Sequence, residues 1–226
     1  MSRCPPRHHR PSRSSRMSDP PAIAADGATV VLDGTTLLAP TTFAVPPGAF
    51  RCLIGGNGSG KTTLLRAFLG TRRLTGGSVR LRGETADLTT PRHRRTVAAL
   101  VDPVPVSRDM TLREQTTLVA ASWYGNTATT AARAEDMLDR LGLTALGDRF
   151  PGRLSSGQLQ LFHLALTLVR PADVVLLDEP ERHLDTDRVA LVAELLAERA
   201  RQGAALLVAT HEPALVAACD GVVEPG

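Results

Sequence analysis

Lys61, the one lysine among the 26 lysine and arginine residues of the chain, lies in a glycine-rich segment. The segment reads Gly55-Gly56-Asn57-Gly58-Ser59-Gly60-Lys61-Thr62 and separates an apolar run at 50–54 from a helical pattern at 61–69. Glycines let successive backbone N–H groups converge on phosphate oxygens, and a lysine ammonium is compact enough to reach the outer phosphates of a triphosphate. The hydroxyl that follows the lysine is suited to a magnesium ion. The segment therefore predicts a nucleotide-binding loop, and the alternative is a glycine-rich turn without a ligand. The candidate nucleotide-binding residues are Gly55, Asn57, Gly58, Ser59, Gly60, Lys61, Thr62 and Thr63.

Two adjacent carboxylates, Asp178 and Glu179, follow the apolar run at 174–177. An apolar strand that ends in acidic residues can stand beside a phosphate-binding loop in a parallel sheet. Asp178 would hold magnesium directly or through water, and Glu179 would orient or deprotonate the water that attacks the phosphate. A strand that ends in Asp-Glu is common on its own, so this prediction depends on its pairing with the glycine-rich loop.

A third motif, Leu154-Ser155-Ser156-Gly157-Gln158, precedes a long apolar helical pattern. Ser155 and the N–H of Gly157 at a helix N-terminus suit a γ-phosphate, and the alternative is an ordinary helix N-cap. With these three motifs in this order, the chain resembles the ATP-binding subunits of ABC transporters over residues 28–225.

The resemblance implies an ATPase that uses ATP and Mg²⁺. Residues 154–158 correspond to the family's signature loop, usually Leu-Ser-Gly-Gly-Gln, which contacts ATP held by a second subunit. Two subunits, as a homodimer or a heterodimer, would then sandwich two ATP molecules. Asp185 corresponds to the D-loop aspartate that communicates between the two sites, and His211 to the switch histidine that contacts the γ-phosphate. A lone histidine at a strand end is otherwise a surface or capping residue. The residues expected at the partner's ATP are Ser155, Ser156, Gly157 and Gln158, and the expected catalytic residues are Glu179 and His211.

The sequence departs from the family pattern at three places. Asp102 stands where the Q-loop glutamine is usual. It remains a candidate magnesium ligand beside Thr62 and Asp178, but its shorter reach and added charge favour slower hydrolysis. Leu32 stands where the family often stacks an aromatic ring on adenine, which favours looser base selectivity. Ser156 replaces the first signature glycine, a change that the fold tolerates unless the backbone there needs a positive φ.

The order of apolar runs and helical patterns predicts an α/β fold with a P-loop nucleotide hydrolase core. Alternating strands and helices indicate a mainly parallel sheet that is covered on both faces. The resemblance adds an N-terminal antiparallel β subdomain and an inserted α-helical subdomain at about 103–153. Residues 28–226 form one ATPase domain in this prediction. Residues 1–27, rich in Arg, Pro and Ser, are expected to be a disordered tail, with Met17 as an alternative start of translation.

The positive charge of the chain belongs to that tail. The formal net charge is +3, but five arginines and no acidic residue lie within 1–16, so the remainder carries −2 (3 − 5). A slightly acidic domain is not expected to bind nucleic acid. The sequence has no apolar run of membrane-spanning length and no secretory signal pattern, so the expected location is cytoplasmic.

These observations predict a cytoplasmic ATPase subunit that drives a separately encoded transmembrane permease from the inner face of the membrane. The apolar stretch Val104-Pro105-Val106 is either the surface for that permease or a turn with ordinary packing. Two other functions stay open. One is an ABC-type ATPase without a transporter, which the single domain and the absence of a heptad run disfavour. The other is an ATP-sensing regulatory subunit with weak turnover, which Asp102 and Leu32 favour.

Overall fold

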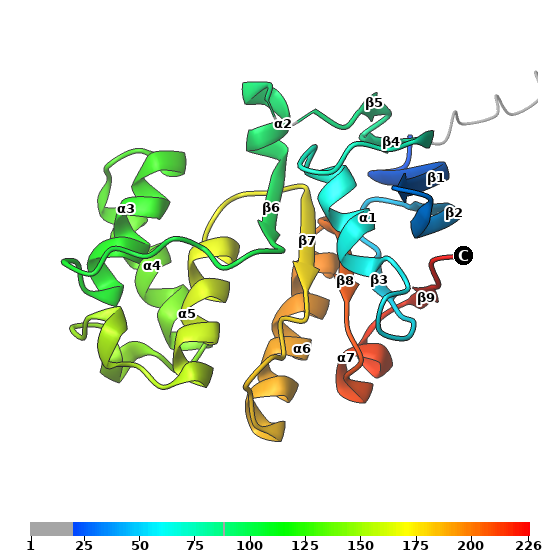
Figure 1. Ribbon diagram of the computed structural model, residues 1–226. Coiled ribbons are helices and arrows are strands. Elements are labelled where there is room, and N and C mark those ends of the chain that lie inside the picture. Colours follow the sequence, from blue (N-terminus) through cyan, green and yellow to red (C-terminus); the bar gives the residue numbers. More distant parts are fainter. Residues whose placement is uncertain (1–19, 88) are drawn as a thin grey trace, which may run out of the picture.

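The computed structural model describes residues 20–87 and 89–226, so residues 1–19 of the predicted tail lie outside the described residues. A five-stranded parallel sheet, in the order β6-β7-β8-β3-β9, forms the centre of this part (Figure 1). Its strands are β6 (Val97–Leu100), β7 (Val174–Asp178), β8 (Ala205–Ala209), β3 (Phe50–Leu53) and β9 (Gly221–Val223). The predicted mainly parallel sheet is confirmed.

Residues along β7 explain why both faces of this sheet are covered. Val175 and Leu177 pack into one hydrophobic core, and Val174 and Leu176 pack into another. Successive side chains of a strand point to opposite faces, so a continuous apolar run supplies both cores. Helices α5 (Ser156–Leu168), α6 (Thr186–Arg201) and α7 (Pro213–Ala218) contribute to the first core, and α1 (Lys61–Phe68) contributes to the second.

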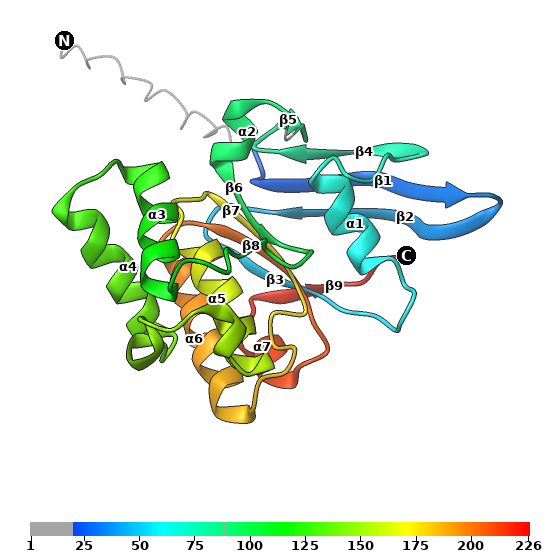
Figure 2. The ribbon, with the colours of Figure 1, turned by 60° about the vertical axis from the view of Figure 1, so that its left-hand side comes forward.

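An antiparallel sheet in the order β2-β1-β4-β5 lies over α1, on the opposite side of the molecule from α3 and α4 (Figure 2). Its strands are β1 (Ile23–Leu32), β2 (Thr35–Val45), β4 (Gly76–Leu81) and β5 (Glu84–Thr85). Phe43 of β2 meets Phe68 of α1 edge to face, with ring centroids 6.2 Å apart. This contact joins the antiparallel sheet to the helix that follows the glycine-rich segment.

The start of β1 corrects the predicted tail. The disordered tail was expected to reach residue 27, but β1 begins at Ile23 and pairs with both β2 and β4. Ile23 and Ala25 are buried in the core behind this sheet. Small alanine side chains carry little hydrophobic signal in the sequence, yet they fit a strand that is paired on both edges.

The helices α3 (Leu112–Tyr124) and α4 (Ala128–Arg140) pack against each other and against α5, within the segment proposed as the helical subdomain. A capping box begins α3, where Thr111 and Glu114 exchange hydrogen bonds. Two short 3-10 turns, η1 (Thr144–Leu146) and η2 (Pro151–Arg153), lead from α4 to α5, and α2 (Pro91–Thr96) precedes β6. None of the described helices is both long and apolar enough to cross a bilayer.

Candidate functional site

The glycine-rich segment forms a loop between β3 and α1, with Lys61 as the first residue of the helix. Gly58 and Gly60 have φ angles of 82° and 94°, which residues other than glycine rarely adopt. A Cβ atom at Gly60 would also lie 2.7 Å from the carbonyl oxygen of Leu37, so the close approach of β2 requires glycine. Ser59 places a buried hydroxyl oxygen in this loop that has no hydrogen-bond partner among the described residues. A helix N-terminus with an unpaired hydroxyl fits a phosphate group.

Lys61 lies folded back over the loop. Its ammonium donates to the carbonyl oxygens of Gly55 at 2.6 Å and Gly56 at 3.0 Å, and the residue is only 8% exposed. A buried ammonium must be hydrogen-bonded, and these two carbonyl groups satisfy it. The ammonium is therefore held against the loop by its own backbone carbonyls.

Thr62 and Asp178 meet across the boundary between α1 and β7. The Thr62 hydroxyl donates a hydrogen bond of 2.6 Å to the Asp178 carboxylate. Burial raises the pKa of Asp178 above its ordinary value, the Thr62 hydrogen bond partly opposes this rise, and the nearby charge of Glu179 adds to it. A magnesium ion keeps several waters and needs only one or two protein oxygen ligands, so this hydroxyl–carboxylate pair fits it. Within the described residues, no group of three or more His, Cys, Asp or Glu side chains is arranged to hold a metal ion.

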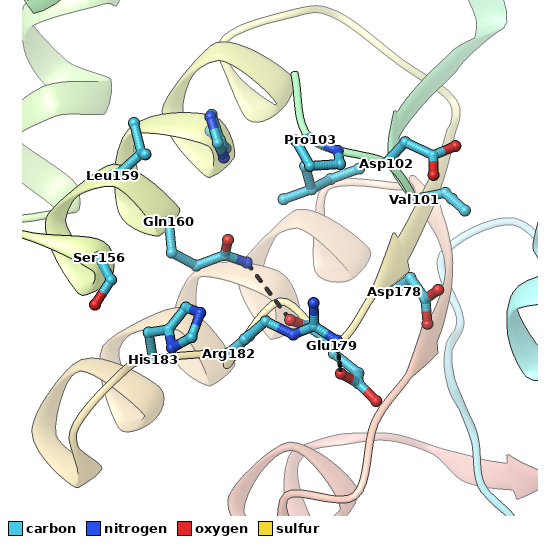
Figure 3. A pocket seen from close by; sticks show the side chains of 12 residues that line it. Val101, Asp102, Pro103, Ser156, Leu159, Gln160, Asp178, Glu179, Arg182 and His183 are labelled. Atoms are coloured by element: carbon cyan, nitrogen blue, oxygen red, sulfur yellow. Dashed lines mark hydrogen bonds and ion pairs between the residues drawn. The ribbon is translucent and has the colours of Figure 1, made fainter. Parts of the chain in front are cut away.

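Glu179 follows β7 with a positive φ of 47° and donates its N–H to the carbonyl of Ala209 at the end of β8. Its carboxylate is paired with Arg182, whose guanidinium lies 2.7 Å away (Figure 3). The sequence motifs gave no sign of this partner. The two residues stand three positions apart, and the turn between them brings the opposite charges together.

Asp102 lies just beyond the end of β6, and its carboxylate pairs with Arg66 of α1 at 2.7 Å. It shares a pocket of about 350 Å³ with Asp178 and Glu179. The figure shows the Asp102 and Asp178 side chains on the side of this pocket away from the α5 helix (Figure 3). The structure thus brings Asp102 near the other two acidic residues, while its predicted role as a magnesium ligand stays a prediction.

Helix α5 begins at Ser156, inside the segment predicted as the signature loop. Ser155 caps the helix: its hydroxyl accepts the N–H of Gln158 at 3.3 Å, and the Gln158 side chain accepts the N–H of Ser155 at 3.0 Å. Ser156 has no positive φ, so the backbone at this position does not require the glycine that is usual in the family. Gly157 is constrained differently, because a Cβ atom there would lie 2.6 Å from the carbonyl oxygen of His183. The cap geometry is present, and a role at the partner's nucleotide stays a prediction.

Glu181, four residues before the predicted D-loop aspartate Asp185, connects this segment to the predicted switch histidine, His211. One Glu181 carboxylate oxygen accepts the Thr210 hydroxyl at 2.6 Å and the N–H of His211 at 3.3 Å. Its other oxygen is buried and unpaired within the described residues. Asp185 caps α6 by accepting the N–H of Arg188 at 3.0 Å. Glu181 was missed by the sequence motifs, although an acidic residue two positions after Glu179 is a visible signal.

Leu32, the residue predicted at the base-stacking position, ends β1 and is 49% exposed. Val31 beside it is 41% exposed. The surface there offers aliphatic contact, and the prediction of a weakly selective base site is untested by these observations.

Comparisons with known proteins give one consistent family and fold. A family model described as "ABC transporter" matches residues 38–182. An Fe(3+) ions import ATP-binding protein of Rhodococcus jostii is 35% identical over 79% of this chain and 53% of its own length. A probable metal transport system ATP-binding protein of Chlamydia trachomatis is 34% identical over 84% of this chain and 74% of its own length. A solved structure of an ATP-binding subunit of an ABC transporter superposes with a TM-score of 0.77 at 25% identity, covering 90% of this chain and 85% of that one. The chain spans 53% and 58% of two iron-import relatives from Rhodococcus jostii.

Proposed function

Because the chain belongs to the ABC transporter family as an ATP-binding domain, we propose that it hydrolyses ATP to drive a separately encoded transmembrane permease. The observation that carries this proposal is the hydrogen bond between Thr62 and Asp178. It joins the helix after the phosphate-binding loop to the acidic end of β7. A magnesium nucleotide site requires a hydroxyl and a carboxylate on neighbouring elements, and Thr62 and Asp178 supply them.

The chain's own residues divide the chemistry between them. The loop N–H groups and Lys61 bind the phosphates, with the lysine ammonium exchanging its carbonyl partners for phosphate oxygens. Thr62 and Asp178 would hold magnesium, which neutralises phosphate charge when bound, and Asp102 is the further candidate ligand. Glu179 accepts a proton from the attacking water while the bond between the γ-phosphorus and the bridging oxygen breaks and ADP leaves. His211 holds the γ-phosphate during this step.

The second half of each site comes from another subunit in this proposal. Ser155, Ser156, Gly157 and Gln158 contact the nucleotide of the partner, and Asp185 connects the two sites. The N-terminus of α5, with its capped first turn, supports such a role because helix N-termini favour anions. Either two copies of this chain or this chain and a related ATPase subunit form the pair.

A groove of about 810 Å³ supports the docking of a permease. It runs between the α2–β6 segment and α3, and its apolar lining includes Val104, Val119 and Trp123. Val104 belongs to the stretch for which the sequence left open a permease surface or an ordinary turn, and Arg95 and Arg170 add positive charge to the groove. We infer that this face meets the permease on the inner side of the membrane. Replacing Val104 with Asp should then weaken capture by the permease without lowering ATP binding.

Turnover of ATP by the purified chain tests the ATPase proposal directly. Phosphate release with magnesium present should fall by at least about a hundred-fold in Lys61→Ala, which loses a phosphate-binding charge, and in Glu179→Gln, which loses the acceptor of the water proton. Exposed Glu194 in α6 supplies the matched control, Glu194→Gln, which should keep wild-type turnover. Equal turnover in wild type and Lys61→Ala would contradict the proposal.

The regulatory alternative has one structural observation in its favour. Asp102 and Glu179 are both paired with arginines of the same chain, Arg66 and Arg182. Pairing of this kind favours slow turnover after ATP has bound. ATP binding with a normal affinity, but no phosphate release even with the permease present, would select the ATP-sensing function.

A further inference from the structure

The carboxylate of Glu179 and the guanidinium of Arg182 are each other's partners. Arg182 Nη2 lies 2.7 Å from Glu179 Oε2 (Figure 3). No second hydrogen bond or ion pair engages either charged group within the described residues. The Arg182 side chain is 63% exposed and the Glu179 side chain 35% exposed, so this one contact sets where both groups point.

The backbone beneath the pair is held from two sides. The N–H of Arg182 donates to the carbonyl of Glu179 at 3.1 Å and closes the turn. From α5, the Gln160 amide donates to the Pro180 carbonyl at 3.1 Å. On the other side, Glu181 is tied to Thr210 and His211. The turn is therefore anchored, and the two charged side chains are the parts that can separate.

A carboxylate in this contact is oriented by the arginine rather than by a water molecule. One of its oxygens already receives a charge-assisted hydrogen bond, which is among the stronger hydrogen bonds in proteins. While the contact is closed, the attacking water competes with the guanidinium for this carboxylate. An exposed ion pair nevertheless favours its closed form only weakly, by up to about five-fold, so the contact can open and close.

We propose that Arg182 restrains Glu179 within the same chain, and that hydrolysis requires the ion pair to open. The inference rests on the proposed function, in which Glu179 accepts the proton of the attacking water. Arg182 acts here through Glu179 and is a positioning residue. The restraint is a property of residue 182 itself, since the surrounding turn is held by other contacts.

The kinetic experiment compares Arg182→Gln with Arg182→Lys in the full-length chain. Arg182→Gln removes the charge, and kcat should rise up to about five-fold while KM changes less than about two-fold. Arg182→Lys keeps a positive charge and should return kcat toward the wild-type value. The matched control is Arg201→Gln, an exposed arginine of α6 outside the site, which should leave kcat unchanged. A kcat for Arg182→Gln at or below that of wild type would overturn the inference, because the arginine would then support the reaction.

A second readout does not depend on turnover. A water-soluble carbodiimide with glycine ethyl ester labels accessible carboxyl groups, and peptide mass spectrometry locates the label. Labelling of Glu179 without nucleotide should increase up to about five-fold in Arg182→Gln and stay near wild type in Arg182→Lys, with exposed Glu194 as the internal reference. Unchanged labelling of Glu179 would show that the contact does not hold in solution and would overturn the inference. Turnover equal to that of Lys61→Ala in every variant would instead overturn the proposed function, whatever the labelling result.

Discussion

The Asp178 carboxylate is a half-buried acidic group beside a second carboxylate, Glu179. Burial and the charge of Glu179 raise its pKa, and the Thr62 hydroxyl compensates only in part. A carboxyl group with a raised pKa in the folded chain binds more protons there than in the unfolded chain. Its contribution to stability is therefore complete below the ordinary pKa of 3.8 and is lost as pH rises through the folded pKa.

In buffer that contains a chelator, Asp178→Asn should remove the loss of stability that the ionisation of Asp178 causes as pH rises. The amide keeps an oxygen that accepts from Thr62 but carries no buried charge. We expect the variant to be more stable than wild type at pH 7 and the difference to vanish near pH 3.5, with a slope below about 1.4 kcal/mol per pH unit because solvent reaches part of the carboxylate. Urea unfolding midpoints across this pH range measure the effect. A stability difference between the variant and wild type that does not vary with pH would show that the ionised carboxylate of Asp178 is not its cause.

Individual side-chain pairs were the part of the site that the sequence predicted least. Motif spacing predicts that Thr62 and Asp178 belong to one site, because both follow strands of a parallel sheet. It does not predict that Arg182 pairs with Glu179 or that Glu181 holds the N–H of His211. Those contacts depend on the turn after β7, whose positive φ at Glu179 has no signature in the residue types.

Helix α5 and the D-loop segment pack through the backbone at one point. Gly157→Ala would place a methyl group 2.6 Å from the carbonyl oxygen of His183. Residue 157 is fixed in helix α5, and the His183 carbonyl belongs to the backbone, so neither group can move aside easily. We therefore expect the unfolding free energy to fall by about 1–3 kcal/mol. Thermal or urea unfolding measures it. Gly152→Ala is the matched control, since its Cβ atom would meet nothing within 4 Å and its φ is ordinary. Equal losses in both variants would exclude close packing as the reason for glycine at 157.

Strands and helices with a strong apolar pattern were predicted nearly to their ends. Helix α1 and strand β7 begin where the sequence places them, because Gly-rich or polar residues mark their limits. The start of β1 was missed by several residues. Ala22, Ile23 and Ala25 are buried by pairing with β2 and β4, and a contact between strands distant in sequence leaves no local pattern.

At the scale of the whole molecule, the sites proposed for ATP are incomplete without a second subunit. The loop after β3 and the start of α5 each lie at a helix N-terminus, and the proposal assigns these two termini to phosphates of different nucleotides. If so, a chain that binds ATP but cannot hydrolyse it should accumulate as a closed pair. Glu179→Gln is that chain, because the amide keeps the size of the side chain but cannot accept the water proton.

Light scattering on Glu179→Gln should therefore show a doubling of mass with magnesium and ATP, and a single chain with magnesium and ADP. The double variant Glu179→Gln with Lys61→Ala should remain a single chain, because it lacks the ammonium that binds the phosphates. Glu194→Gln, exposed on α6, should also remain a single chain under turnover because its ATP is consumed. A Glu179→Gln variant that binds ATP and stays a single chain would show that the pair requires the permease, or that the partner is a different ATPase subunit. Repeating the measurement with the permease present would separate these two, since only the first predicts two copies of this chain in one complex.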